Sequence, residues 1–258
     1  MKAKTSKTAV QEVYQLPSKG KLYSQYGEDF NGEVTIRSMT TFEEKNRLGS
    51  QGFWGTMVGI LNAVVISPEN FNVEDMTLFD FYFLMYKMRV VSYGPIYKVS
   101  VTCPHCNKTM ISRVNLDELE ITYLPDDFKE PFTVGPLPRS GDTLTCKFLR
   151  VRDSIADERK AKEILRDYPD YVGDPEYILK RVSQIVTING EDVPAPLRKN
   201  YVEDMQAMDS AYFIQAYNKL TDDFGMSIRC RETCESCGEM FDFTLPFNSE
   251  FFRPTFDF

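Results

Sequence analysis

The chain has 258 residues, of which 42% are hydrophobic and 26% are charged, so it can bury a sizeable core and has the composition of a globular protein. Its 38 acidic and 30 basic residues give a net charge of −8, which disfavours a protein that binds nucleic acid through a basic face. The longest apolar run, residues 53–66, is shorter than the roughly 20 residues needed to cross a bilayer, so we expect a soluble protein without a membrane span.

Residues 1–14 are predicted to form a flexible basic tail. Their lysines are not followed by the apolar stretch that a secretory signal has. The next segment, 16–23, reads Leu-Pro-Ser-Lys-Gly-Lys-Leu-Tyr, and its proline and glycine indicate a short turn. The sequence leaves open whether Gly20 and Lys21 serve an interface or shape this turn, and the turn is the simpler interpretation. A strand is expected at 33–37.

Residues 15–95 are predicted to combine this strand with three helices. The first helix begins with a capping box at 40–44 and ends at Gly49. The second spans about 53–66. The third spans about 73–91, and its apolar stripe is explained better by helix packing than by a ligand site.

Two Cys-x-x-Cys pairs follow, Cys103/Cys106 and, much later in the chain, Cys234/Cys237. Each pair lies where one strand of alternating polar and apolar residues turns back into another. This spacing is typical of zinc ligands.

The two pairs also share their turn chemistry, because aligning them superimposes Asn107 on Gly238. Asparagine and glycine are the residues that most easily adopt positive φ, which the turn after a metal-bound cysteine requires. We therefore predict two zinc knuckles, residues 96–116 and 226–246, that form one zinc ribbon.

One knuckle supplies two thiolates, whereas a closed structural zinc site needs four ligands. We therefore predict that Cys103, Cys106, Cys234 and Cys237 together bind one structural Zn²⁺ ion. Zinc binding contributes roughly 10–16 kcal/mol in small peptides, more than the about 4 kcal/mol needed to close a loop of this length. Two alternatives remain: disulfides between the pairs, although nothing else in the sequence suggests secretion, and a redox motif, which should open a helix rather than a strand.

The remaining cysteines and the single histidine are less informative. Cys146 is predicted to be a small buried hydrophobe. Cys230 lies on the same side as the ligands by alternation and could replace one of them, although Cys234 and Cys237 have the better spacing. His105 is expected to be an exposed loop residue between two ligands.

Residues 117–225 are predicted to form a mixed α/β insertion between the knuckles, and the fold class is α+β. The expected elements are a strand at 143–151, helices at 154–167 and 175–186, a hairpin turn at 189–190, and a helix from 198 or 205 to 221. The mixed charges of 157–167 indicate a solvated face or, alternatively, a docking surface.

The C-terminal tail, residues 247–258, is rich in phenylalanine, and such apolar rings are costly to leave in water. The tail either folds back on its own domain or inserts into a neighbouring subunit. The residues that we tentatively assign to partner docking are Phe251, Phe252, Phe256 and Phe258.

The sequence offers little catalytic chemistry. A histidine base would have to be His105, and neither a Walker sequence nor a Gly-x-Gly-x-x-Gly motif is present. A zinc ion with four cysteine ligands has no open position for water or substrate. We therefore do not expect an enzyme.

The Leu-Pro-Ser-Lys-Gly turn, the strand after it and the Thr-Thr-Phe-Glu-Glu helix start resemble the beginning of T4-type phage baseplate hub and tail-assembly proteins. The resemblance covers residues 14–95, and the knuckles and aromatic terminus agree with it more loosely. It implies a non-enzymatic component of the tail tip whose partners are other tail and baseplate proteins in a larger hetero-oligomer. It also implies a location in the host cytoplasm during assembly and then in the virion.

Two other functions stay open at this stage. A zinc-ribbon protein that binds nucleic acid or modulates transcription would carry a basic face with aromatics. A transient assembly chaperone would share every sequence signal but be absent from the finished particle.

Overall fold

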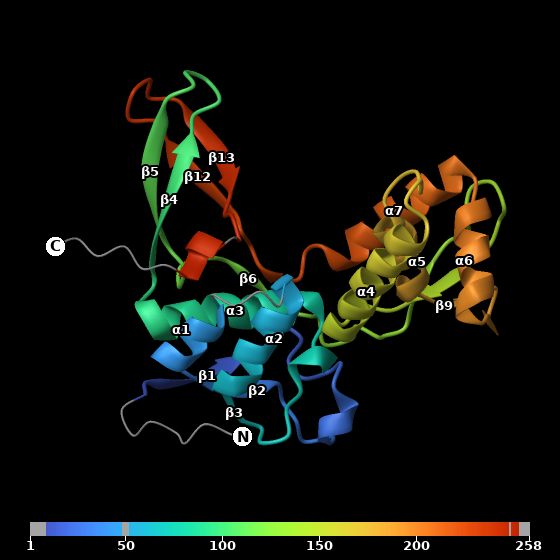
Figure 1. Ribbon diagram of the computed structural model, residues 1–258, viewed down its shortest axis with the longest axis horizontal. Coiled ribbons are helices and arrows are strands. Elements are labelled where there is room, and N and C mark those ends of the chain that lie inside the picture. The colour runs from blue at the N-terminus through green and yellow to red at the C-terminus, as the bar shows by residue number, and fades with distance from the viewer. Residues whose placement is uncertain (1–8, 48–51, 248, 253–258) are drawn as a thin grey trace.

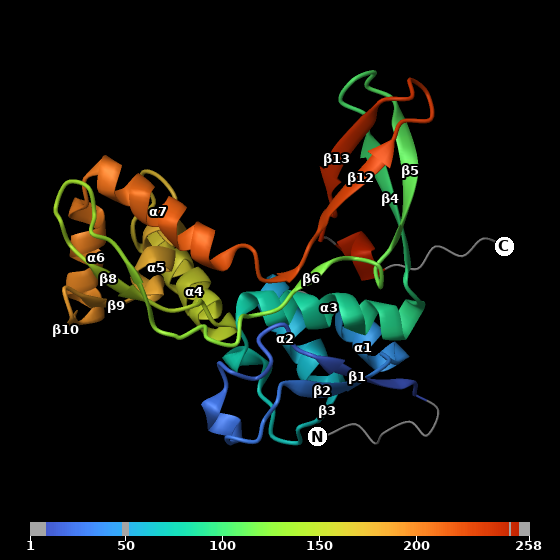
Figure 2. The ribbon, with the colours of Figure 1, turned by 180° about the vertical axis from the view of Figure 1, so that it is seen from behind.

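The computed structural model describes residues 9–47, 52–247 and 249–252, and it has an α+β fold built from three parts (Figure 1). We call them the body (residues 9–95), the pillar (hairpins 96–115 and 229–244) and the lobe (residues 130–222). Both ribbon views show the pillar projecting from the body and the lobe lying to one side of it (Figure 2). No helix in the described ranges is long and apolar enough to span a membrane.

The body combines a three-stranded antiparallel sheet, in the order β1-β2-β3, with three helices. Strand β1 begins at Gln11, inside the stretch expected to be a tail, and pairs along its length with β2. The second helix ends at Val64, earlier than expected, because the next residues form the edge strand β3. The elements are β1 (Gln11–Gln15), η1 (Ser24–Tyr26), β2 (Glu33–Arg37), α1 (Thr41–Arg47), α2 (Gly52–Val64), β3 (Val65–Ser67), η2 (Val73–Asp75) and α3 (Leu78–Tyr93).

The capping box predicted for the first helix is confirmed. The side chain of Glu43 accepts the backbone N–H of Thr40 at 2.8 Å, and the Thr40 hydroxyl accepts the N–H of Phe42 at 3.3 Å. Glu43 also forms a buried ion pair with Arg37 at 2.8 Å. The expected end of this helix, Gly49, lies outside the described residues.

Helix α3 is the centre of the body and is buried on most of its surface. The prediction that it begins at Val73 is wrong: a short 3-10 turn comes first, and α3 begins after Thr77, whose hydroxyl accepts the N–H of Asp80 at 3.4 Å. Gly94, at φ 85°, ends the helix.

The Leu-Pro-Ser-Lys-Gly turn is fixed to the start of α3. The backbone N–H of Ser18 and the hydroxyl of Tyr23 donate to the fully buried carboxyl of Asp80 at 3.0 and 2.5 Å. Burial raises the pKa of Asp80. A Cβ at Gly20 (φ 76°) would lie 2.4 Å from the carbonyl oxygen of Phe30, so only glycine fits there. These contacts favour the interpretation of the segment as a turn.

The lobe is a four-stranded sheet, in the order β10-β9-β8-β7, packed with four helices. It has a hydrophobic core of its own, which includes Leu144, Ile185 and Phe213. The elements of the lobe are β7 (Phe132–Val134), β8 (Leu144–Cys146), α4 (Val151–Asp167), α5 (Pro175–Gln184), β9 (Ile185–Ile188), β10 (Glu191–Asp192), α6 (Ala195–Asp204) and α7 (Ala207–Thr221). Strands β6 (Ile121–Thr122) and β11 (Gly225–Met226) pair where the chain enters and leaves the lobe.

The details of the lobe differ from the sequence prediction in two places. The strand expected at 143–151 is shorter, because the chain turns into α4 at Val151. Of the two starts expected for the helix that ends at 221, the later one, at 205, agrees with α7, and the earlier one is wrong because the extended backbone of Met205 separates α7 from α6. The turn at Asn189–Gly190 is confirmed, with φ of 52° and 81°.

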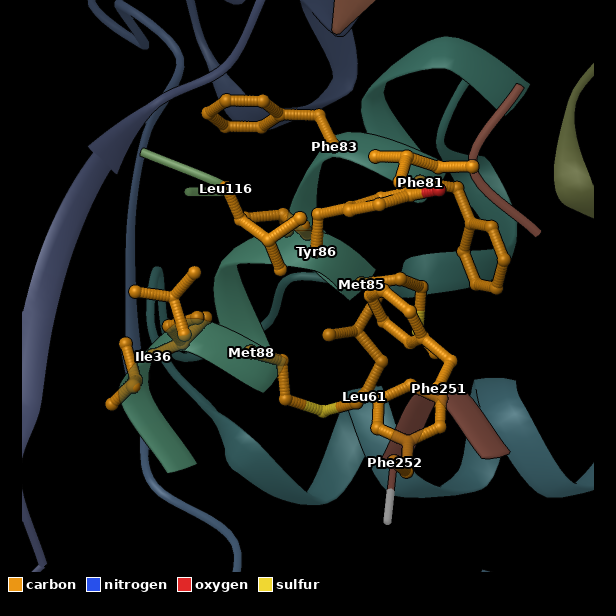
Figure 3. Close-up of a cluster of buried hydrophobic side chains, with 14 of the residues drawn as sticks. Ile36, Leu61, Phe81, Phe83, Met85, Tyr86, Met88, Leu116, Phe251 and Phe252 are labelled. Carbon is orange, nitrogen blue, oxygen red and sulfur yellow. The ribbon is translucent and has the colours of Figure 1, made fainter. Parts of the chain in front are cut away.

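The C-terminal phenylalanines Phe251 and Phe252 lie in the core of the body, at 0% and 1% exposure, and not on a surface open to docking (Figure 3). Arg89 of α3 holds this segment, because its guanidinium donates to the carbonyl oxygens of Phe251, Gly94 and Ile96. The segment therefore folds back on its own chain, which is the first of the two alternatives. Phe256 and Phe258 lie outside the described residues.

Candidate metal centre

The pillar consists of two antiparallel hairpins that come from opposite ends of the insertion (Figure 1). The first is β4 (Ile96–Thr102) with β5 (Thr109–Asn115), and the second is β12 (Arg229–Thr233) with β13 (Met240–Thr244). Their period-2 patterns turn rows of apolar side chains inward, so the hairpins lie against each other with their turns at the same end.

The two turns have the same backbone geometry. In the first, the N–H of Asn107 donates to the carbonyl of Cys103 at 2.9 Å, and in the second the N–H of Gly238 donates to the carbonyl of Cys234 at 2.8 Å. Asn107 and Gly238 both have positive φ, at 57° and 76°. The turn repeat predicted from the sequence is therefore confirmed.

The structure brings together the four cysteines of the two Cys-x-x-Cys pairs. Their sulfur atoms all lie within 4.8 Å of one another. Two distances across the hairpins are 3.8 Å, from Cys103 Sγ to Cys237 Sγ, and 3.6 Å, from Cys106 Sγ to Cys234 Sγ. In a tetrahedron with metal–sulfur bonds of about 2.3 Å, the sulfurs lie about 3.8 Å apart. The donor set therefore fits a tetrahedral thiolate-bound metal.

The sulfurs of the second pair have different surroundings. The backbone N–H groups of Cys237 and Ser236 lower the pKa of the Cys234 thiol to about 6, whereas desolvation and the neighbouring thiols raise the pKa of Cys237 to about 12. Cys103 and Cys234 are buried, while Cys237 is exposed at the tip. All six cysteines of the chain are free thiols, and the two distances between the hairpins exceed the about 2.0 Å of a disulfide bond.

The other residues singled out by the sequence lie outside this cluster. Cys146 is fully buried in the lobe, where burial raises the pKa of its thiol to about 12. Cys230 lies on β12 with its sulfur 4.0 Å from the carbonyl oxygen of Ile228. His105 is exposed in the first turn, as predicted.

Sequence reasoning missed the contact that joins the two hairpins below their tips. The hydroxyl of Ser112 on β5 donates to Glu232 on β12 at 2.6 Å, and Ser112 is 2% exposed. The sequence signal for this contact is the alternation of side chains along β12, which places Glu232 on the same side of the strand as Cys230.

Comparison with known proteins gives one clear result. The family model described as T4 bacteriophage base plate protein matches residues 9–253. No curated protein and no solved structure matches the chain. The matched range includes the body, the lobe and both hairpins with all four clustered cysteines, and thus extends far beyond residues 14–95. The chain therefore belongs to the T4 bacteriophage base plate protein family.

Proposed function

We propose that this protein is a structural or assembly component of the hub, or tail tip, of a contractile phage tail baseplate, and that it acts through contacts with other tail proteins. The observation that carries this proposal is membership of the baseplate family over nearly the whole chain. The projecting pillar and the separate lobe give the body two extensions that neighbouring subunits could contact (Figure 1).

The proposal includes one zinc ion held by Cys103, Cys106, Cys234 and Cys237. The spacing of the sulfurs and the repeated turns support this assignment. With all four positions filled by thiolates, the ion would have no place for water or substrate, so its role would be structural. It would hold together two turns that lie at opposite ends of the inserted lobe, and the protein would work without catalysing a reaction.

The location follows from the same role. The chain would be made in the host cytoplasm, join a hetero-oligomer of tail proteins there, and remain in the virion baseplate. Its net charge of −8 agrees with protein partners better than with nucleic acid.

Mass spectrometry of purified phage particles, combined with chemical cross-linking, tests this function. We expect peptides of this chain in finished particles and cross-links to tail proteins at the tip. Elemental analysis of the isolated protein should give about one zinc per chain. Absence from finished particles, with presence in assembly intermediates, would instead identify a transient chaperone. A chain found only in complexes with nucleic acid would overturn the proposal.

A further inference from the structure

Strand β1 (Gln11–Gln15) is an open edge of the sheet in the body. The sheet order is β1-β2-β3, and among the described residues only β2 pairs with β1. Both ribbon views place this sheet on the side of α3 opposite to the pillar, so the pillar does not cover β1 (Figure 1, Figure 2). The strand contains no lysine or proline, the residues that often prevent an edge strand from pairing. It can therefore accept a further strand.

The hydrogen bonds to β2 show which backbone groups of β1 face this open edge. The N–H of Ser38 donates to the carbonyl of Val10 at 2.8 Å, and the N–H of Leu16 donates to the carbonyl of Gly32 at 2.9 Å. Hydrogen-bonded residues alternate along an antiparallel strand, so the even-numbered residues of β1 bond to β2 and the odd-numbered residues turn their N–H and C=O groups away from it. The outward-facing residues are Gln11, Val13 and Gln15.

The middle of this edge also exposes apolar surface. Tyr14 faces the core, where its ring lies 6.3 Å from that of Phe83 on α3. Because side chains alternate along a strand, Val13 faces the solvent, and it is 61% exposed. Open backbone groups beside an exposed valine fit an occupant that is itself a β-strand.

The sequence of β1 is complementary to itself in the antiparallel direction. When Val13 lies opposite Val13 of a second copy, Gln11 lies opposite Gln15 and Glu12 opposite Tyr14. The outward-facing residues of the two strands then meet, so every outward N–H and C=O finds a partner. Glu12, the one charged residue of the strand, faces a tyrosine and not a second glutamate, which avoids like charges directly opposite each other.

We propose that β1 is an interaction surface for a second copy of this chain, which adds its own β1 in the antiparallel direction about a two-fold axis at Val13. The two sheets then become one continuous sheet, and the two Val13 side chains cover each other. A two-fold interface of this kind is closed, so the product is a dimer and not a filament. The proposal depends neither on the metal nor on the role in the baseplate.

Analytical ultracentrifugation of the full-length protein tests this interface. We expect a reversible dimer, and Val13→Lys should raise its dissociation constant at least about 5-fold, because two lysines would then lie opposite each other. Circular dichroism should show that this variant stays folded, since Val13 is exposed. The matched control Val172→Lys, at a site 94% exposed in the lobe, should dimerise like the parent. A parent that stays monomeric at about 100 µM, or a dimer equally stable in both variants, would overturn the proposal.

Hydrogen exchange at single-residue resolution gives a second measurement. In the dimer the amides of Gln11, Val13 and Gln15 should be protected, and dilution to the monomer should make them exchange at least about 10-fold faster. The amides of Glu12 and Tyr14, which donate to β2, should stay protected in both states. Outward amides that exchange rapidly in the dimer would place its interface elsewhere. Protection that does not change on dilution would mean that the edge is covered within one molecule, and either result contradicts the proposal.

Discussion

The lobe and the pillar are stabilised in different ways. The lobe buries a core of its own, in which Leu144, Cys146 and Ile185 are completely inaccessible to solvent. The pillar is two separate two-stranded hairpins, and an isolated hairpin of this kind is marginally stable in water. Its strands also leave large apolar side chains exposed, such as Ile111 at 57% and Met240 at 65%. The pillar buries only a narrow row of apolar side chains, among them Val99, Val101 and Phe241, and the proposed metal would add a cross-link at its tip.

The position of the thiol cluster follows from this difference. Near the body, the pillar is anchored by apolar contacts such as that of Tyr97 with Phe251, whose rings lie 5.2 Å apart. Farther out, Ser112 and Glu232 join the hairpins, and at the tip the four sulfurs meet. The four sulfurs therefore lie at the outer end of the apolar cluster that runs from the body into the pillar.

The largest expected effect comes from removing one thiol with Cys234→Ala. Zinc sites of this type contribute roughly 10–16 kcal/mol in isolated peptides, so we expect loss of the bound zinc and rapid amide exchange in both hairpin turns, while the lobe keeps its protection. Elemental analysis and hydrogen exchange measure these changes.

The matched control for this variant is Cys230→Ala, which removes a cysteine from the same hairpin outside the cluster. It should keep its zinc and its protected turns. If the parent protein contains no zinc and a chelator leaves its melting temperature unchanged, the pillar does not depend on a metal.

An intermediate effect is expected from Leu144→Ala in the lobe. Leu144 is fully buried between β7 and β9, and a Leu→Ala change in such a core costs about 2–5 kcal/mol. Urea denaturation followed by circular dichroism should show earlier unfolding of the lobe, with the zinc content unchanged. The control Val172→Ala, at a site 94% exposed, should change stability little. Loss of zinc in Leu144→Ala would show that the two extensions are not independent.

The thiol cluster could be predicted from the sequence because its information is local. The Cys-x-x-Cys spacing and a residue that tolerates positive φ, Asn107 or Gly238, occur within one turn and repeat in the other. The α+β class and the capping box at Thr40 are also properties of short segments. Convergence of the two pairs then followed from the need for four ligands.

The remaining features depend on contacts between distant segments. Phe251 is buried because its ring packs against those of Tyr86 and Tyr97, which come far earlier in the chain, and no local pattern predicts these contacts. The apolar residues around Val65 predict a helix, but Val65 lies in β3, which pairs with β2 and completes a sheet whose other strands come earlier in the chain. Long-range pairing outweighs local propensity at such positions.

The third effect concerns the body, where a buried ion pair adds a third kind of stabilisation. Burial raises the pKa of Glu43, but hydrogen bonds from Arg37 and Thr40 outweigh it and lower the pKa from 4.5 to about 2. The carboxylate therefore stabilises the fold above pH 4.5, and this contribution, about 3 kcal/mol, is lost as the pH falls towards 2.

The measurement compares the parent protein with Glu43→Gln, both with chelator so that acid release of zinc affects neither. Urea unfolding is followed through Trp54, which reports on the body because its ring lies 5.5 Å from that of Phe81. The parent should be more stable near neutral pH, and the difference should shrink steadily between pH 4.5 and 2. A difference that stays constant over this range would mean that Glu43 acts through packing and not through its charge. The body would then depend on apolar burial as the lobe does, and the contrast with the pillar would be sharper.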